Sequence, residues 1–244
     1  MRVILNGAGG RMGCEVRELL LSGDGDVRLV AEVDRLAPGY TLKHLSDYKE
    51  SADVIIDFSH HSITEELIAY ALAKELPCVI CTTGHTEDEK ALIKEAAKSI
   101  PVFYSANMSM GIAALCDFAK RAAQLFPDAD IEIVEAHHNR KLDAPSGTAL
   151  MLADSIKTVR NDALYVFGRH GMKKREEKEI GIHALRYGNE PGMHEIIIST
   201  DNQTLSLKHN ARSRAVFAEG AISAAKFICC RCAGLYDMYS LVNL

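Results

Sequence analysis

The densest group of reactive side chains lies in residues 135–149, which read EAHHNRKLDAPSGTA. His137 and His138 end a predicted strand, and Lys141 follows them. Because successive side chains of a strand point to opposite faces, at most one of the two imidazoles needs to be an ordinary core residue. Histidine titrates near neutral pH and suits general acid or base chemistry. The cluster therefore predicts a reactive site where this strand ends.

A predicted helix begins directly after the cluster, at residues 145–148 (PSGT). Its first N–H groups and hydroxyls would receive an anion such as a carboxylate. Plain capping of the helix by Asp143 or Ser146 would use the same atoms, so the two interpretations carry equal weight on the helix start alone. The cation of Lys141 beside it favours the anion site.

A glycine-rich loop, residues 7–13 (GAGGRMG), follows the first predicted strand and leads into a helix. Glycines at such a turn let backbone N–H groups approach a diphosphate at the positive end of the helix. Met12 occupies the third glycine position of the usual dinucleotide fingerprint, whereas Gly7, Gly10 and Gly13 give an alternative spacing. Such a turn can also be purely structural, so the neighbouring residues must decide whether it binds a dinucleotide.

Asp34 and Arg35 supply that context at the end of the second predicted strand. A carboxylate there favours the 2′-hydroxyl of NAD, whereas a guanidinium can accept the 2′-phosphate of NADP. The pair predicts tolerance of NADH or NADPH, with a solvated Asp–Arg turn as the alternative. Two more loops after strands, residues 81–84 and 106–109, carry hydroxyl and amide groups that suit the nicotinamide ribose and carboxamide.

The elements that position these loops alternate over the first hundred residues, where short apolar runs and amphipathic stretches predict a parallel sheet of βαβ units. Strands are expected at residues 2–6, 27–34, 52–58, 77–82 and 101–105. Ser62-x-x-Glu65 and Thr86-x-x-Glu89 are expected to form capping boxes that open helices. Both faces of the sheet should be covered, because its central runs are continuously apolar.

After residue 105 the pattern changes to one helix at residues 110–126 followed mainly by strands. These strands are expected at residues 131–136, 163–167, 179–186, 195–200 and 203–208, with one helix at 148–160. The predicted fold class is α/β, with an N-terminal Rossmann-like parallel sheet domain and a C-terminal α+β domain with a mixed sheet. We expect domains at residues 1–105 and 106–214, with the helix and tail at 215–244 returning to the first.

Composition excludes several classes of function. The 244 residues carry 28 Lys plus Arg against 33 Asp plus Glu, a formal charge of -5, which argues against nucleic-acid binding. No stretch approaches the roughly 20 apolar residues of a membrane span, and we expect a cytoplasmic protein. The 7 Cys fit reduced thiols. Cys78 and Cys81 are three apart on a predicted strand and should diverge, which disfavours a zinc site.

Together these motifs resemble the 4-hydroxy-tetrahydrodipicolinate reductase (dihydrodipicolinate reductase) family. The resemblance covers the whole chain and rests on the two motifs above and on four shorter segments: residues 57–59 (DFS), 82–84 (TTG), 105–109 (SANMS) and 234–238 (GLYDM). It implies reduction of a cyclic dicarboxylate in diaminopimelate and lysine biosynthesis. It also implies NADH or NADPH in the first domain, substrate and tetramerisation contacts in the second, and a homotetramer.

The resemblance also implies roles for individual residues. His137 would be the acid/base residue, and Lys141 a proton donor or an anchor for a substrate carboxylate. Substrate contacts are expected from His138, Ser146, Gly147, Thr148 and Arg214. Cofactor contacts are expected from Gly7, Ala8, Gly9, Gly10, Arg11, Met12, Asp34, Arg35, Phe58, Cys81, Thr82, Thr83, Ala106, Asn107, Met108 and Ser109. Cys81 and Met108 depart from the family, which more often has Gly and Phe there.

Two other classes of function remain as alternatives. A metal-dependent hydrolase would use His137, His138 and Asp143, with His183 or His194, although adjacent strand residues diverge and the glycine loop would be idle. A non-catalytic dinucleotide sensor would keep the first domain and have no use for the histidine cluster. A nucleophile pair of Ser146 and Lys141 lacks the strand–turn–helix context of a nucleophile elbow.

Overall fold

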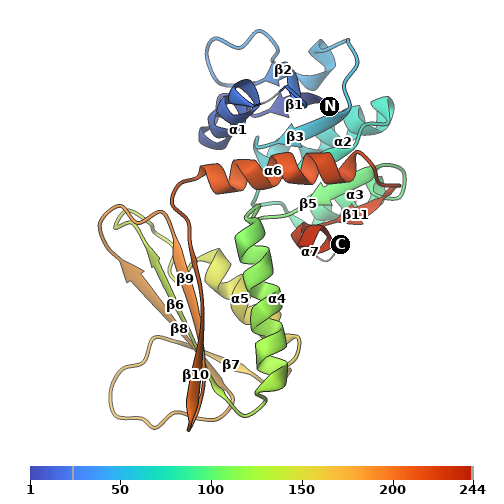
Figure 1. The fold of residues 1–244 in the computed structure, drawn as a ribbon. Coiled ribbons are helices and arrows are strands. Elements are labelled where there is room, and N and C mark those ends of the chain that lie inside the picture. Colours follow the sequence, from blue (N-terminus) through green and yellow to red (C-terminus); the bar gives the residue numbers. More distant parts are fainter. Residues whose placement is uncertain (24, 243–244) are drawn as a thin grey trace. The chain divides into compact units, whose positions relative to one another are not determined.

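The structure of the chain is a computed structural model that describes residues 1–23 and 25–242. Two compact units make it up: Met1–Met110 with Arg214–Leu244, and Gly111–Ser213. Each unit has its own sheet and its own helices (Figure 1). Within the described ranges, no helix combines the length and the apolar character needed to cross a membrane.

The first unit is built on a six-stranded parallel sheet with the strand order β11-β5-β4-β3-β1-β2. The strands are β1 (Arg2–Asn6), β2 (Arg28–Val33), β3 (Val54–Asp57), β4 (Cys78–Ile80), β5 (Pro101–Tyr104) and β11 (Gly234–Tyr236). The helices are α1 (Arg11–Ser22), α2 (Thr64–Lys74), α3 (Glu87–Ala96), α6 (Ala215–Ile228) and α7 (Met238–Val242), with single 3₁₀ turns η1 (Leu45–Asp47) and η2 (His61–Ile63). Every residue of β3 and β4 is buried, as expected for central parallel strands. Helix α1 packs beside α6, and α6 crosses β3, β4 and β5 (Figure 1).

The second unit is built on a five-stranded mixed sheet with the order β10-β9-β6-β8-β7. The strands are β6 (Asp130–His137), β7 (Leu164–Phe167), β8 (Glu179–Arg186), β9 (Met193–Thr200) and β10 (Gln203–Asn210). Strands β6, β7 and β8 run parallel, whereas β9 is antiparallel to both β6 and β10. Helices α4 (Met110–Leu125) and α5 (Gly147–Lys157) bury Ile112, Leu115, Leu152 and Ile156 in one core with Ile131 and Ile133 of β6. The predicted fold class, a parallel sheet followed by a mixed one, is confirmed.

Local signals predicted some helix starts correctly and missed others. Thr86 and Glu89 form the expected capping box: the Thr86 hydroxyl accepts from the Glu89 N–H at 3.2 Å, and the Glu89 carboxylate accepts from the Thr86 N–H at 2.7 Å. The box expected at Ser62 is wrong, because Ser62 lies inside the η2 turn. His60 caps that turn instead, and α2 begins at Thr64.

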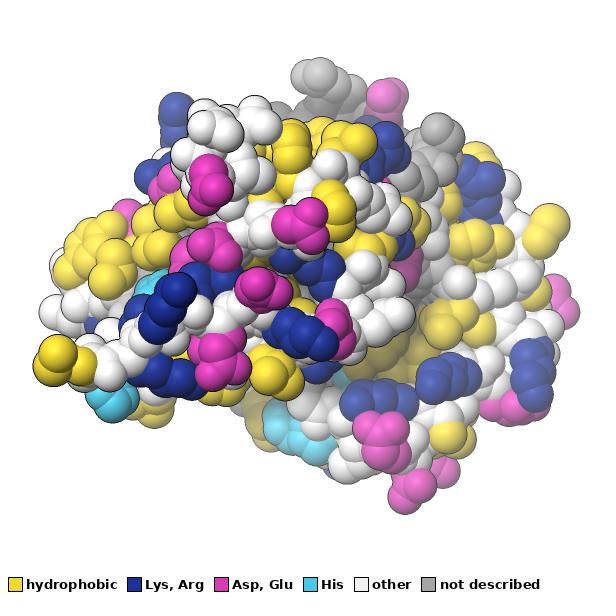
Figure 2. All heavy atoms as spheres, turned by 90° about the horizontal axis from the view of Figure 1, so that it is seen from below, with side chains coloured by type: hydrophobic (Ala, Val, Ile, Leu, Met, Phe, Trp, Pro, Cys, Tyr) yellow, Lys and Arg dark blue, Asp and Glu magenta, His cyan; other side chains and the backbone are white. Residues whose placement is uncertain are grey.

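The sequence did not predict the strand β11, because a run of three residues is too short to show a periodic pattern. It pairs with β5 and extends the first sheet, and the preceding helix α6 ends at Ile228. On the face shown in Figure 2, basic and acidic side chains alternate without forming a patch of one sign.

Candidate active site

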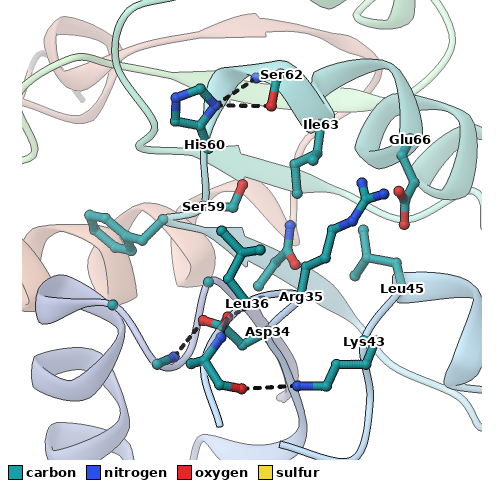
Figure 3. Close-up of a pocket in the computed structure, with 16 residues that line it drawn as sticks. Asp34, Arg35, Leu36, Lys43, Leu45, Ser59, His60, Ser62, Ile63 and Glu66 are labelled. Carbon is teal, nitrogen blue, oxygen red and sulfur yellow. Dashed lines mark hydrogen bonds between the residues drawn. The ribbon is translucent and has the colours of Figure 1, made fainter.

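A cavity of about 620 Å³ lies at the carboxyl ends of β1, β2 and β3 in the first unit. This volume falls within the range of small-molecule sites, and the position is where parallel α/β sheets bind ligands. The predicted residues that line it are Gly7, Gly9, Gly10, Asp34, Arg35 and Phe58. The sequence assigned no cofactor role to the other lining residues: Asn6, Leu36, Ala37, Lys43, Leu45, Ser59, His60, Ser62, Ile63 and Glu66. They come from three strand ends and the loops after them, from the turns η1 and η2 and from α2, so only the tertiary fold gathers them (Figure 3).

The glycine loop brings the start of α1 against this cavity. Gly7 has a φ of +78°, and a Cβ there would lie 2.5 Å from the carbonyl oxygen of Phe58. At Gly13 a Cβ would collide with the carbonyl oxygen of Gly7, because α1 packs directly on the loop. Both positions therefore require glycine, one for its conformation and one for close approach.

Hydrogen bonds within the fold use the N–H groups of the loop itself. Gly7 and Ala8 donate to the Val33 carbonyl at 2.9 and 3.2 Å, and Gly10 donates to the Gly7 carbonyl at 3.1 Å. The N–H groups of the first turn of α1, at Arg11 and Met12, have no side-chain cap among the described residues. A diphosphate would thus be received at Arg11 and Met12, where the helix leaves its first N–H groups open.

Asp34 ties the glycine loop to the end of β2. Its Oδ2 accepts from the Gly9 N–H at 2.9 Å, and its Oδ1 accepts from the Leu36 and Ala37 N–H groups at 3.0 and 2.7 Å. Burial acts to raise the pKa of Asp34, but the bonds from Ala37, Gly9 and Leu36 outweigh it and hold the pKa below its usual value. The side chain is thus a carboxylate, and backbone donors fix its position.

The neighbouring Arg35 extends along the cavity with its guanidinium directed toward Glu66 of α2 (Figure 3). Glu66 itself lies 3.0 Å from Nδ1 of His44, measured from its Oε1. Lys43 lines the same cavity and donates to the carbonyl of Ala37 at 2.9 Å. This part of the cavity thus combines the cations of Arg35 and Lys43 with the carboxylates of Asp34 and Glu66.

The remaining predicted cofactor residues lie outside the lining of this cavity: Ala8, Arg11, Met12, Cys81, Thr82, Thr83, Ala106, Asn107, Met108 and Ser109. The side chains of Cys81, Thr82, Met108 and Ser109 are buried. The hydroxyl of Thr82 donates to Asp57 at 2.6 Å, so its proton is engaged inside the fold. Thr83 and Ala106 are exposed.

In the second unit, His137 lies beside a buried carboxylate. Glu135 and His137 are two apart on β6 and share a face, and Nδ1 of His137 lies 2.6 Å from Oε2 of Glu135. Glu135 is 0% exposed, and Arg186 donates to both of its oxygens, at 2.8 and 2.7 Å. Arg186 is brought there by the pairing of β6 with β8, in which it stands opposite His137.

Electrostatics keep this carboxylate ionised. Burial by itself would raise the pKa of Glu135, but hydrogen bonds from His137, Arg186 and the Ser146 N–H lower it to about 2. The Ser146 N–H donates to Oε1 at 2.9 Å. Glu135 therefore carries a charge throughout the physiological pH range.

Ser146 and His194 form a second contact next to this pair. The Ser146 hydroxyl caps α5 by accepting from the Ala149 N–H at 3.2 Å, and it lies 3.1 Å from Nε2 of His194. The hydroxyl is thus engaged within the fold, and Ser146 is 2% exposed. Burial, followed by the charge of His137, lowers the pKa of His194 to about 4, so His194 is neutral at pH 7.

The other predicted substrate residues are differently placed. Lys141 forms an ion pair with Asp143 at 2.9 Å, and half-buried His138 donates its backbone N–H to the Glu190 carbonyl. Gly147 is the first residue of α5, followed by Thr148, and a Cβ on Gly147 would meet no atom within 4 Å. Space for a ligand therefore exists at this helix start. Arg214 belongs to the first unit, as the N-cap residue of α6.

Sequence reasoning assigned no role to Glu135 or Arg186 and considered His194 only as a metal ligand. Glu135 stood in the quoted motif, whereas Arg186 could have been found only from the register of β6 and β8. In the part of the chain that the structure describes, no three His, Cys, Asp or Glu side chains are grouped to hold a metal ion.

Both halves of the chain are similar to known reductases of dihydrodipicolinate or 4-hydroxy-tetrahydrodipicolinate. Residues 1–108 match the family model of the dihydrodipicolinate reductase N-terminus, and residues 111–242 match that of its C-terminus. The 4-hydroxy-tetrahydrodipicolinate reductase of Caldanaerobacter subterraneus subsp. tengcongensis is 44% identical over 250 residues, covering 100% of this chain and 98% of that protein. The enzyme of the same name from Clostridium tetani is 41% identical and covers 100% and 97%.

Solved structures give the same result for the fold. The dipicolinate-bound dihydrodipicolinate reductase from Paenisporosarcina sp. TG-14 aligns with a TM-score of 0.79 at 26% identity, covering 97% of each chain. An amine dehydrogenase from Mycobacterium smegmatis, at 11% identity and a TM-score of 0.63, shares the fold alone. Neither a metal-dependent hydrolase nor a dinucleotide sensor finds support in these comparisons. With both halves matched and the full length covered, the chain belongs to the dihydrodipicolinate reductase family.

Proposed function

We propose that this chain reduces the ring of 4-hydroxy-tetrahydrodipicolinate (dihydrodipicolinate) to tetrahydrodipicolinate with NADH or NADPH, in diaminopimelate and lysine biosynthesis. The observation that carries the proposal is the pairing of His137 with the buried Glu135 next to the open start of α5. Relatives named for this reaction cover the full chain and support it.

A doubly negative substrate needs cations and N–H donors. Lys141 supplies an ammonium, and the N–H groups of Gly147 and Thr148 begin a helix whose first turn carries no acidic residue. The Paenisporosarcina relative was solved with dipicolinate bound, which suggests a ring dicarboxylate here as well. We assign one carboxylate to the start of α5 with Lys141, and we keep His138 and Arg214 as further proposed contacts.

Reduction of the ring also needs an acid. The bound nicotinamide would supply hydride, which leaves negative charge on the conjugated ring. His137 would neutralise that charge by donating the proton of Nε2, while Nδ1 stays hydrogen-bonded to Glu135. General acid catalysis of this kind contributes roughly 10²–10⁴ in rate.

For the cofactor, the first unit offers the cavity and the open helix start. The N–H groups of Arg11 and Met12 would hold the diphosphate, Asp34 the ribose, and Arg35 a 2′-phosphate when one is present. We therefore propose that both NADH and NADPH are used. The expected homotetramer and cytoplasmic location stay predictions, the former testable by light scattering of the purified protein.

The deciding experiment is a coupled assay that generates substrate from pyruvate and aspartate semialdehyde and follows the loss of reduced-nicotinamide absorbance. The wild-type chain should show turnover with either cofactor. His137→Gln should lower kcat at least about a hundredfold while the Kd for NADH stays unchanged. Absence of turnover in the wild type refutes the proposed reaction, and near-normal turnover in the variant removes His137 from it.

A further inference from the structure

The two ring nitrogens of His137 have different surroundings. Nδ1 lies 2.6 Å from Oε2 of Glu135, and an ionised carboxylate can only accept a hydrogen bond. Nδ1 must therefore carry the proton in the neutral ring as well as in the cation. On the other side, Nε2 lies against Gly192, where a Cβ would come within 3.2 Å of it. Nε2 is thus the nitrogen left to exchange a proton with a ligand.

We propose that Glu135 is a positioning residue for the reduction, holding His137 as the Nδ1–H tautomer with Nε2 toward the substrate, and that glycine at position 192 keeps that nitrogen accessible. This inference rests on the proposed function, because it assigns Nε2 to the proton transfer of that reaction. It adds a carboxylate that never touches the substrate.

The hydrogen-bonding capacity of Glu135 is fully used. Oε1 accepts from the Ser146 N–H and from Nη2 of Arg186, and Oε2 pairs with His137 and accepts from Nη1 of Arg186. Four donors on two oxygens match the four lone-pair sites of a carboxylate. A buried charge is tolerated only when it is paired in this way, and the bidentate hydrogen bonds from Arg186 fix the orientation of the carboxylate. Any rotation of the carboxylate away from this position would break these hydrogen bonds.

Glu135 also links the imidazole to the helix start proposed for substrate binding. Ser146, whose N–H it accepts, is the N-cap residue of α5, and Gly147 follows. Arg186 donates to the Asp143 carbonyl as well, at 2.6 Å. One buried carboxylate thus sets the distance between the acid and the first N–H groups of α5.

Glutamine at position 135 would replace one acceptor oxygen by an NH₂ group and set it against the donors of His137 or Arg186. In Glu135→Gln we expect kcat to fall about tenfold or more, a changed pH profile of kcat, and an unchanged Kd for NADH. The tautomer itself can be read by ¹⁵N NMR of histidine-labelled protein, with His137→Gln identifying the signal. Wild type should show Nδ1–H, and Glu135→Gln should shift toward the Nε2–H form.

Glu132→Gln is the matched control. Glu132 lies on the same strand and also pairs with a histidine and an arginine, His183 at 2.8 Å and Arg175 at 3.2 Å, but it stands an odd number of residues away and so on the opposite face. This variant should change the signal of His183 and leave that of His137 and kcat as in wild type.

Gly192→Ala provides a second variant with the hydrogen bonds of Glu135 intact. Its added methyl would press on Nε2, so kcat should fall while the signal of Nδ1–H persists. An Nε2–H tautomer in wild type overturns the proposal, even if Glu135→Gln fails to fold. So does a folded Glu135→Gln protein with the wild-type tautomer and pH profile. The spectra need no substrate, so they decide this proposal separately from the reductase assay.

Discussion

Lowering the pH from 7.5 to 5 should destabilise the folded protein through His194. This residue is 4% exposed, and burial together with the charge of His137 lowers its pKa to about 4, against 6.5 for an ordinary histidine. The unfolded chain therefore binds a proton at pH 5 that the folded chain does not bind. Stability from this residue is complete above pH 6.5 and declines as the pH falls toward 4.

The magnitude follows from the two pKa values. At pH 5 the unfolded histidine is almost fully protonated and the folded one is almost fully neutral, which costs about 2 kcal/mol of the free energy of unfolding. His85 and His209 also have lowered pKa values because of burial, and they add a loss of the same sign. Glu135, with its pKa near 2, contributes little at pH 5.

His194→Gln separates the contribution of His194 from the others. The amide can keep a hydrogen bond to the Ser146 hydroxyl but cannot titrate. The free energy of unfolding, measured with urea, should therefore fall by about 2 kcal/mol less in the variant than in wild type between pH 7.5 and 5. Because each protein is compared with itself at the two pH values, the effect of the substitution on stability at pH 7.5 cancels. His170→Gln, at an exposed position, is the control and should follow wild type. An equal loss in wild type and His194→Gln would refute the burial of a neutral imidazole there.

Three further outcomes are expected. Gly13→Ala should weaken NADH binding at least about tenfold in a fluorescence titration, because its methyl would collide with the Gly7 carbonyl and push α1 off the loop; an unchanged Kd would contradict this packing. Glu66→Gln should raise the ratio of kcat/KM for NADPH over NADH several-fold, since a carboxylate facing Arg35 opposes a 2′-phosphate (Figure 3); a constant ratio would exclude Glu66 from cofactor choice. Lys141→Ala should raise KM for the substrate or lower kcat without affecting NADH affinity, and a weaker Kd for NADH would place Lys141 in the wrong site.

The first sheet was predictable because its signals are local and repeated. Continuous apolar runs gave β3 and β4, and the spacing of Thr86 and Glu89 gave the start of α3. The short strand β11 escaped because its place depends on pairing with β5, more than a hundred residues earlier in the chain. Ser62 shows the converse case, in which the local pattern of a capping box is present but a 3₁₀ turn capped by His60 forms there instead.

The sequence by itself determined which chemical groups are present: a glycine turn that only glycine can make, an imidazole at a strand end, and a helix start beside a lysine. Tertiary structure alone decided their states. Arg186 reaches Glu135 across 51 residues through strand register, and Thr82 turns its hydroxyl inward to the buried Asp57, which also accepts from Asn6 and Ser59. Residue type fixes what a group can donate or accept, whereas its partners and its protonation depend on neighbours that only folding brings within hydrogen-bonding distance.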